Sequence, residues 1–162
     1  MRIAVGPDHF AVIDDEDASL VLPFRWHLHK SKTPRSLNLY AAALDRSQGL
    51  IKTIYMHRLI LGTASGVFVD HIDHNGLNNS RSNLRECSNS QNMANSRWPV
   101  GKSGYRGVSF YKPEGTWKAR ISINGKEKTL GYRKTPDAAA RLYDDAARVH
   151  FGEFAITNFA DD

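Results

Sequence analysis

The feature that most constrains the fold is a pair of short strand candidates that flank a loop rich in Asn, Gly and Ser. The first segment, residues 68–71, is a short apolar stretch with β-branched Val67 and Val69 and is predicted to be a strand. The loop spans residues 73–82, and residues 84–87 form a second strand candidate. Ser88 is followed three residues later by Gln91, a capping-box pattern that begins a helix. This stretch is therefore predicted to fold as strand, loop, strand and helix.

Polar residues suited to metal binding and proton transfer lie at the ends of these elements. Asp70 and His71 end the first strand, and Asn92 falls in the first turns of the helix. Carboxylate and amide oxygens bind hard divalent cations, and a neutral imidazole beside such an ion can take a proton from water. The residues outline a site for phosphodiester hydrolysis, in which Arg85 is either a phosphate contact or an exposed arginine at a strand end. The alternative is a plain surface loop, since Asn and Asp favour turns for local reasons.

This stretch, over residues 56–95, resembles the HNH motif of ββα-metal nucleases, in the form found in phage and intron-encoded homing endonucleases. The resemblance implies that His71 acts as the general base and that Asn83 braces the loop that aims it. It also implies that Asp70 and Asn92 bind Mg²⁺, Mn²⁺ or another divalent cation. A surface loop leaves the preceding strand and the capped helix unexplained, so the HNH interpretation is preferred.

The composition favours a soluble globular protein with one domain or two small ones, because 41% of the 162 residues are hydrophobic and 24% are charged. No apolar run approaches the roughly 18 residues of a membrane span, and the start has no signal-peptide pattern. We therefore expect a cytoplasmic protein, and the resemblance to phage homing endonucleases implies a bacterial or phage-infected host cell. Cys87 is the only cysteine, which excludes an internal disulfide and a multi-cysteine zinc site.

The residues before the motif are predicted to form a strand-rich extension, residues 1–55. The strand candidates are residues 10–13, 26–29, 39–43 and 51–55. A short helix over residues 56–61 is predicted to end at Gly62. This arrangement is similar to the segment that often precedes the HNH motif in phage homing endonucleases.

A segment rich in Pro, Gly and Ser, residues 96–104, is typical of a linker. We therefore place a domain boundary near residue 100. The predicted nuclease domain covers residues 1–99, with its HNH core at residues 56–96. A second predicted domain covers residues 100–162.

Positive charge is concentrated after this boundary. Residues 102–134 carry nine Lys or Arg and two Glu, a net charge of +7, whereas residues 135–162 carry two Arg and six acidic residues, a net charge of −4. Residues 1–50 are neutral, with six basic and six acidic residues. The net charge of +5 for the whole chain favours a polyanionic partner, and the basic segment is the predicted surface for it.

The second domain is predicted to be a three-stranded antiparallel sheet packed on one helix. The strand candidates are residues 105–111, 116–123 and 128–132, and Asn124-Gly125 is a hairpin signal. Apolar residues alternate along the middle strand with Lys118, Arg120 and Ser122, so one face is apolar and the other basic.

The helix of this domain is predicted to begin after Thr135, an N-cap candidate followed by Pro136. It is predicted to end before Gly152. Residues at helical spacing give it an apolar face that covers the sheet, namely Ala139, Leu142, Ala146 and Val149.

Residues 103–159 contain the motifs Tyr105-Arg106-Gly107-Val108, Trp117-Lys118-Ala119 and Ala155-Ile156-Thr157-Asn158-Phe159. They resemble the plant ethylene-response-factor and APETALA type DNA-binding domain, which lays its sheet in the major groove of double-stranded DNA. The groove-facing residues implied by the resemblance are Arg106, Ser109, Tyr111, Lys118, Arg120, Ser122 and Thr129. Serine and tyrosine replace three arginines often seen in the plant domains, so the base sequence read there is not transferred. The alternative for the basic face is a solubilising surface.

These expectations combine into an α+β protein, a ββα-metal nuclease module followed by a sheet-and-helix DNA-binding module. The predicted function is a site-specific or sequence-tolerant DNA endonuclease of the homing type, which uses one metal ion. The rival hypothesis is a non-catalytic, sequence-specific regulator on a nuclease-derived scaffold. Monomer and dimer both stay open. Because each chain offers one HNH site, a double-strand break needs a dimer or two successive events.

Overall fold

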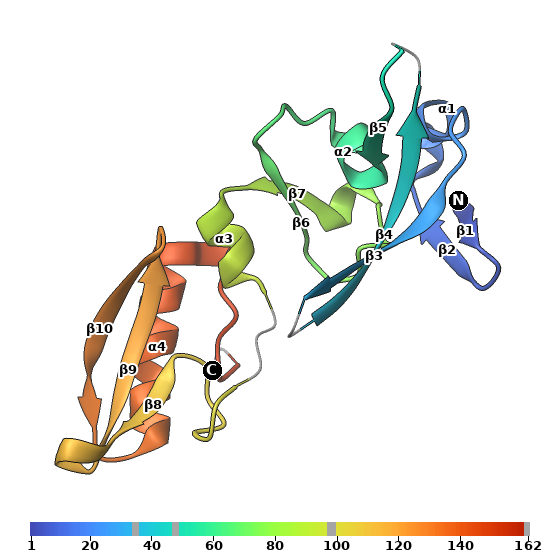
Figure 1. The fold of residues 1–162 in the computed structure, drawn as a ribbon. Coiled ribbons are helices and arrows are strands. Elements are labelled where there is room, and N and C mark those ends of the chain that lie inside the picture. Colours follow the sequence, from blue (N-terminus) through green and yellow to red (C-terminus); the bar gives the residue numbers. More distant parts are fainter. Residues whose placement is uncertain (34–35, 47–48, 97–99, 161–162) are drawn as a thin grey trace. The chain divides into compact units, whose positions relative to one another are not determined.

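Short antiparallel sheets supply most of the regular structure in a computed structural model that describes residues 1–33, 36–46, 49–96 and 100–160 (Figure 1). Together with a few helices they give the mixed α and β composition that the sequence predicts. The chain divides into two compact units, Met1–Cys87 and Ser88–Asp162. The predicted linker includes residues 97–99, which lie outside the described residues, so the domain limits near residue 100 stay a prediction.

Two sheets form most of the first unit. One pairs β1 (Arg2–Gly6) with β2 (His9–Val12), and the other has the order β3 (His27–Thr33), β4 (Ser36–Asp45) and β5 (Lys52–Tyr55). Each predicted strand is found, although β3 and β4 extend further into their hairpin than predicted. Strand β1 was not predicted, because a run of three apolar side chains is too short to distinguish a strand from a loop.

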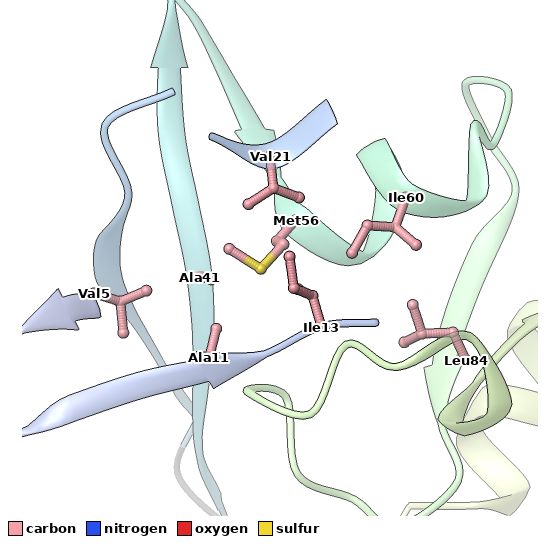
Figure 2. Close-up of a cluster of buried hydrophobic side chains, with 8 residues drawn as sticks. All are labelled: Val5, Ala11, Ile13, Val21, Ala41, Met56, Ile60 and Leu84. Carbon is pink, nitrogen blue, oxygen red and sulfur yellow. The ribbon is translucent and has the colours of Figure 1, made fainter. Parts of the chain in front are cut away.

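The core of this unit lies where these sheets meet three short helices. The helices are η1 (Asp15–Asp17), α1 (Ala18–Val21) and α2 (Met56–Leu61), and Gly62 ends α2 in the left-handed conformation, as predicted. Figure 2 shows the buried side chains of the core, which are Val5, Ala11, Ile13, Val21, Ala41, Met56, Ile60 and Leu84. Leu84 belongs to the predicted second strand of the motif, so the core anchors the motif.

The motif begins as a two-stranded hairpin. Strand β6 (Phe68–His71) pairs with β7 (Leu84–Cys87), which follows the 3-10 helix η2 (Arg81–Asn83). The strand limits are those predicted. The loop between them is tied to β2 by backbone hydrogen bonds from Val12 N to Leu77 O (2.8 Å) and from Asn79 N to Val12 O (2.7 Å). The loop is therefore held against the first sheet around Asn78.

The second unit starts with helix α3 (Asn89–Ala94). Ser88 accepts a hydrogen bond from Gln91 N and its own N–H donates to the Gln91 side chain, so the predicted capping box is formed. The remaining elements are β8 (Val108–Tyr111), η3 (Lys112–Glu114), β9 (Thr116–Ile123), β10 (Lys126–Arg133), α4 (Pro136–Phe151) and η4 (Gly152–Phe154). The sheet has the order β10, β9, β8, and α4 packs on it (Figure 1).

Short sequence patterns predicted a turn and a helix start of this unit correctly. Asn124 and Gly125 both have positive φ, which is the hairpin geometry that their sequence predicts. Thr135 accepts a hydrogen bond from Ala138 N and begins α4. The predicted apolar face of α4 is partly wrong, because Val149 is 81% exposed. The buried side chains of α4 are Ala139, Ala140, Tyr143, Asp144, Ala147 and Phe151.

Among the described residues, no helix is both long enough and apolar enough to cross a membrane.

Candidate functional site

The end of β6 places Asp70 and His71 side by side in sequence and buries both. Their exposed fractions are 6% and 7%. Asp70 lies opposite Arg85 on β7, and His71 lies opposite Leu84, which is part of the core. The hairpin thus brings a carboxylate, an imidazole and a guanidinium together in one part of the first unit.

Arg85 neutralises the buried Asp70 carboxylate. Its Nε and one terminal nitrogen each lie 2.9 Å from Asp70 Oδ2, and the two side chains are 13% and 7% exposed. Burial of a carboxylate without a neighbouring cation costs free energy, so Arg85 stabilises Asp70 in its buried position. The sequence offered two interpretations of Arg85, a phosphate contact or an exposed arginine at a strand end. In the structure Arg85 is largely buried and contacts Asp70.

A fully buried amide fixes the His71 ring. His71 Nε2 lies 3.4 Å from Asn79 Oδ1, and the Asn79 amide nitrogen donates to Leu77 O at 3.2 Å. Because an amide oxygen only accepts hydrogen bonds, this contact favours the tautomer with its proton on Nε2. Nδ1 is then the basic nitrogen of the ring.

Burial keeps the His71 imidazole neutral. Burial lowers its pKa, while the Asn79 hydrogen bond and the carboxylates of Asp73 and Asp70 raise it and offset only part of that effect. The pKa therefore lies below its ordinary value near 6.5. At neutral pH the ring is ready to accept a proton.

Asn83 braces the loop that follows β6. Its amide nitrogen donates to Asp73 Oδ1 (2.9 Å) and Asn78 O (2.8 Å), and its amide oxygen accepts from Asp73 N (3.0 Å). Asp73 in turn accepts from Asn75 N and the Asn78 amide. One buried side chain thus closes the loop across its base.

Aromatic rings surround His71 on the side of β4 and α2. The centroid of the His57 ring lies 5.0 Å away in a T-shaped contact, and that of Tyr40 lies 6.0 Å away. Tyr40 also packs against the loop, since a Cβ at Gly76 would lie 2.6 Å from Tyr40 Cδ1 and would overlap Leu39 O. The sequence did not assign Tyr40, His57 or Asn79 to the site, and it offered His57 only as a nucleic-acid contact or a partly exposed helix residue.

Asn92, the other predicted metal ligand, lies in the second unit, in the second turn of α3. Its backbone N–H donates to Ser88 O at 3.0 Å, and its carbonyl accepts from Ser96 Oγ at 2.9 Å. Its side chain is only partly buried. The capped helix therefore fixes the backbone from which the Asn92 side chain extends.

The carboxylate of Asp70, in the first unit, and the amide of Asn92, in the second, are each a ligand type that a hard divalent cation accepts. The buried Asp70 already requires a neighbouring positive charge, and Arg85 provides one. A different group of acids, Asp14, Glu16 and Asp17, has ligand-like spacing among the described residues. Its oxygens bond Arg81 (2.6 Å to Asp17), so this cluster has a structural role in joining η1 to η2.

The second unit carries a polar face on the sheet side opposite α4. The strand register pairs Ser109 with Lys118 and Arg120 with Thr129, so these side chains share one face. Ser122 follows Arg120 on the same face, and Tyr111 lies two residues beyond Ser109. The structure thus gathers the predicted groove-facing residues, with the exception of Arg106.

Arg106 lies outside the strand alternation because β8 begins only at Val108. Its guanidinium donates to the carbonyls of Ser96 (2.7 Å) and Met93 (3.1 Å) at the end of α3. Its backbone is held by Asn158, which accepts from Arg106 N and donates to Arg106 O. The expectation that Arg106 belongs to the sheet face is therefore not met.

An acidic residue that sequence reasoning did not place lies within the polar face. Glu127 is opposite Ser122 in the register, 2.7 Å from Arg120 and 3.7 Å from Lys118. Arg120 and Glu127 are about half exposed, at 49% and 50%. The two central cations of the face are thus held by one carboxylate.

Comparison with known proteins finds similarity to HNH endonucleases. A family model described as HNH endonuclease matches residues 55–94. An uncharacterized HNH endonuclease of Acanthamoeba polyphaga mimivirus is 35% identical over 156 residues, which cover 96% of this chain and 78% of that protein. Protein 3.8 of Escherichia phage T7 is 32% identical over 91 residues, 56% of this chain and 74% of its own length.

Plant proteins match a shorter part of the chain. An AP2-like ethylene-responsive transcription factor of Arabidopsis thaliana is 47% identical over 64 residues, which are 39% of this chain and 13% of that protein. An APETALA2-like protein of Oryza sativa is also 47% identical over 64 residues. The similarity to these factors is thus confined to a segment the size of one small domain.

Proposed function

This chain belongs to the HNH endonuclease family, and we propose that it hydrolyses phosphodiester bonds of double-stranded DNA with His71 as general base. The observation that carries the proposal is the buried, neutral imidazole of His71 beside the Asp70 carboxylate. The tautomer favoured by Asn79 leaves Nδ1 to take the proton from the attacking water. Asn83 acts indirectly, by closing the loop that follows His71.

Asp70 and Asn92 would hold the divalent cation, Mg²⁺ or a similar ion. When bound, such an ion stabilises the charge that develops on the phosphate and on the leaving oxygen. Arg85 orients the Asp70 carboxylate from the neighbouring strand and brings positive charge close to the scissile phosphate. The metal pair rests on the chemistry of the donors and on the matched motif, which includes both residues.

Binding to DNA is assigned to the polar face of the sheet in the second unit. Lys118 and Arg120 contribute charge at its centre, and Ser109, Tyr111, Ser122 and Thr129 contribute hydrogen-bonding groups around them. The similarity to plant transcription factors over this segment supports the assignment. We propose that the chain is a homing-type endonuclease acting in a bacterial or phage-infected cell, where the sheet supplies affinity and the HNH site supplies cleavage.

A second candidate is a non-catalytic DNA-binding regulator that keeps the nuclease scaffold. The contact that favours it is the Asp70–Arg85 ion pair, since a carboxylate already neutralised by arginine needs no metal for its stability. Under this alternative the sheet face still binds DNA, but His71 does not act as a general base.

Incubation of supercoiled plasmid with the full chain, with and without Mg²⁺, distinguishes the two candidates. An endonuclease converts the plasmid to nicked or linear forms only when the ion is present. A regulator leaves the plasmid supercoiled under both conditions while still retarding it in a gel.

A further inference from the structure

His57 lies at the start of α2, in contact with the site but outside the hydrophobic core of its unit. The residue before Met56 is Tyr55, whose ring stacks on His57 with centroids 5.6 Å apart and an interplanar angle of 23°. Tyr40 approaches from β4 at 5.6 Å. The first turn of α2 therefore places the His57 imidazole in contact with the rings of Tyr40 and Tyr55.

The ring of His57 meets that of His71 edge to face. The centroids are 5.0 Å apart and the planes cross at 81°. Tyr40 contacts both imidazoles, at 5.6 Å and 6.0 Å. His71 thus contacts two aromatic rings and forms a hydrogen bond with Asn79.

His57 is poorly suited to carry protons. Burial first, then the neighbouring charges of His71 and Arg58, lower its pKa to about 3. Its Nδ1 is buried and has no hydrogen-bond partner in the described part of the chain. The His57 ring is therefore neutral and makes no hydrogen bond through Nδ1 to the described residues. Its effect on His71 comes from the packing of the two rings.

We propose that His57 is a positioning residue for cleavage, whose flat ring, together with Tyr40, restricts the His71 imidazole to the orientation in which Nδ1 faces the attacking water. The proposal rests on the proposed function of His71 as the general base. The hydrogen bond at Nε2 fixes one atom of the His71 ring. The edge-to-face contact with His57 limits rotation of the whole ring without competing for the proton.

Two substitutions separate the shape of His57 from its volume and its nitrogen atoms. His57→Phe keeps a flat ring and removes both nitrogens, whereas His57→Leu keeps apolar bulk and removes the ring. The matched control is His29→Ala, which removes a third imidazole that contacts Tyr55 at 5.4 Å. That control leaves both rings that touch His71 in place.

The measurement is the single-turnover rate of plasmid cleavage at saturating full-length protein and Mg²⁺, with DNA affinity determined in parallel. We expect His57→Leu to cut about 10- to 100-fold more slowly at unchanged affinity, as for a misplaced catalytic group. His57→Phe and His29→Ala should cut within a few-fold of the unmodified chain. Circular dichroism at the assay temperature checks folding, and Tyr40→Leu replaces His57→Leu if that variant is unfolded.

The outcomes keep the two proposals apart. If the unmodified chain does not cut, or if His71→Ala cuts equally well, the proposed function fails. If the chain cuts through His71 but His57→Leu is as fast as the unmodified chain, the positioning role is wrong. A His57→Phe variant as slow as His57→Leu would also overturn it, because the ring would then not suffice.

Discussion

Arg85 lies directly across the β6–β7 ladder from Asp70 and bonds the same carboxylate oxygen through two nitrogens, each at 2.9 Å. Both side chains are nearly buried, so the pair contributes a neutral unit to the hairpin. The proposed metal ligand and the arginine therefore depend on each other.

Arg85→Leu is expected to destabilise the chain, because it leaves the Asp70 carboxylate buried without its cation. Removal of one partner of a buried pair typically costs about 3–5 kcal/mol, and the slight exposure of Arg85 favours the lower end of that range. Urea unfolding measures the loss. Millimolar Mg²⁺ should recover part of the stability if the ion binds Asp70. Equal losses with and without Mg²⁺ would argue against Asp70 as a ligand.

The pH dependence of cleavage should follow the deprotonation of His71. Since its pKa lies below 6.5 in the folded chain, the rate should rise with pH in the acidic range and reach its plateau before neutrality. Single-turnover rates between pH 5 and pH 8, with DNA affinity measured at each pH, test this expectation. A rate that keeps rising above pH 7 would point to another base.

Glu127→Gln should strengthen binding to DNA. The substitution removes the carboxylate that holds Arg120 and Lys118 and leaves both cations available to phosphates. The slope of log affinity against log salt should steepen by about one to two, one for each cation that newly contacts a phosphate. Glu114→Gln removes the same charge from η3 and is the matched control. Identical effects of the two variants would mean that only net charge matters.

Arg120→Ala should weaken binding far more than Arg141→Ala. Arg120 is at the centre of the polar face, whereas Arg141 lies on α4, 4.8 Å over the Phe159 ring. A base contact by Arg120 predicts a loss of about 1–3 kcal/mol in binding and relaxed specificity at one position. Affinities at matched salt, with circular dichroism to confirm folding, give the comparison. Losses of equal size would contradict a specific role for this face.

Local sequence signals predicted the elements of both units closely. The capping box at Ser88 and Gln91, the Asn124-Gly125 turn and the Thr135-Pro136 helix start depend on contacts within a few residues, and each is found as predicted. The alternation along β9 likewise identified its buried and exposed faces, because a strand reverses side-chain direction at every residue.

Contacts between distant segments could not be predicted in this way. His57 meets His71 only because α2 and β6 pack on the same core, and no local pattern encodes that approach. Glu127 enters the polar face through the register of β10 against β9, which includes an irregularity between Thr129 and Gly131. Arg106 was predicted to lie on the sheet face. In the structure Gly107, with a φ of 73°, separates it from β8.

The most direct test of the central claim compares the full chain with its His71→Ala variant on supercoiled plasmid, with Mg²⁺ and with a chelator. The account predicts that the unmodified chain nicks or cuts the plasmid only with Mg²⁺, while His71→Ala loses cleavage and keeps its DNA affinity, since no phosphate-binding charge is removed. Cleavage by His71→Ala at the rate of the unmodified chain would contradict the assignment of the general base.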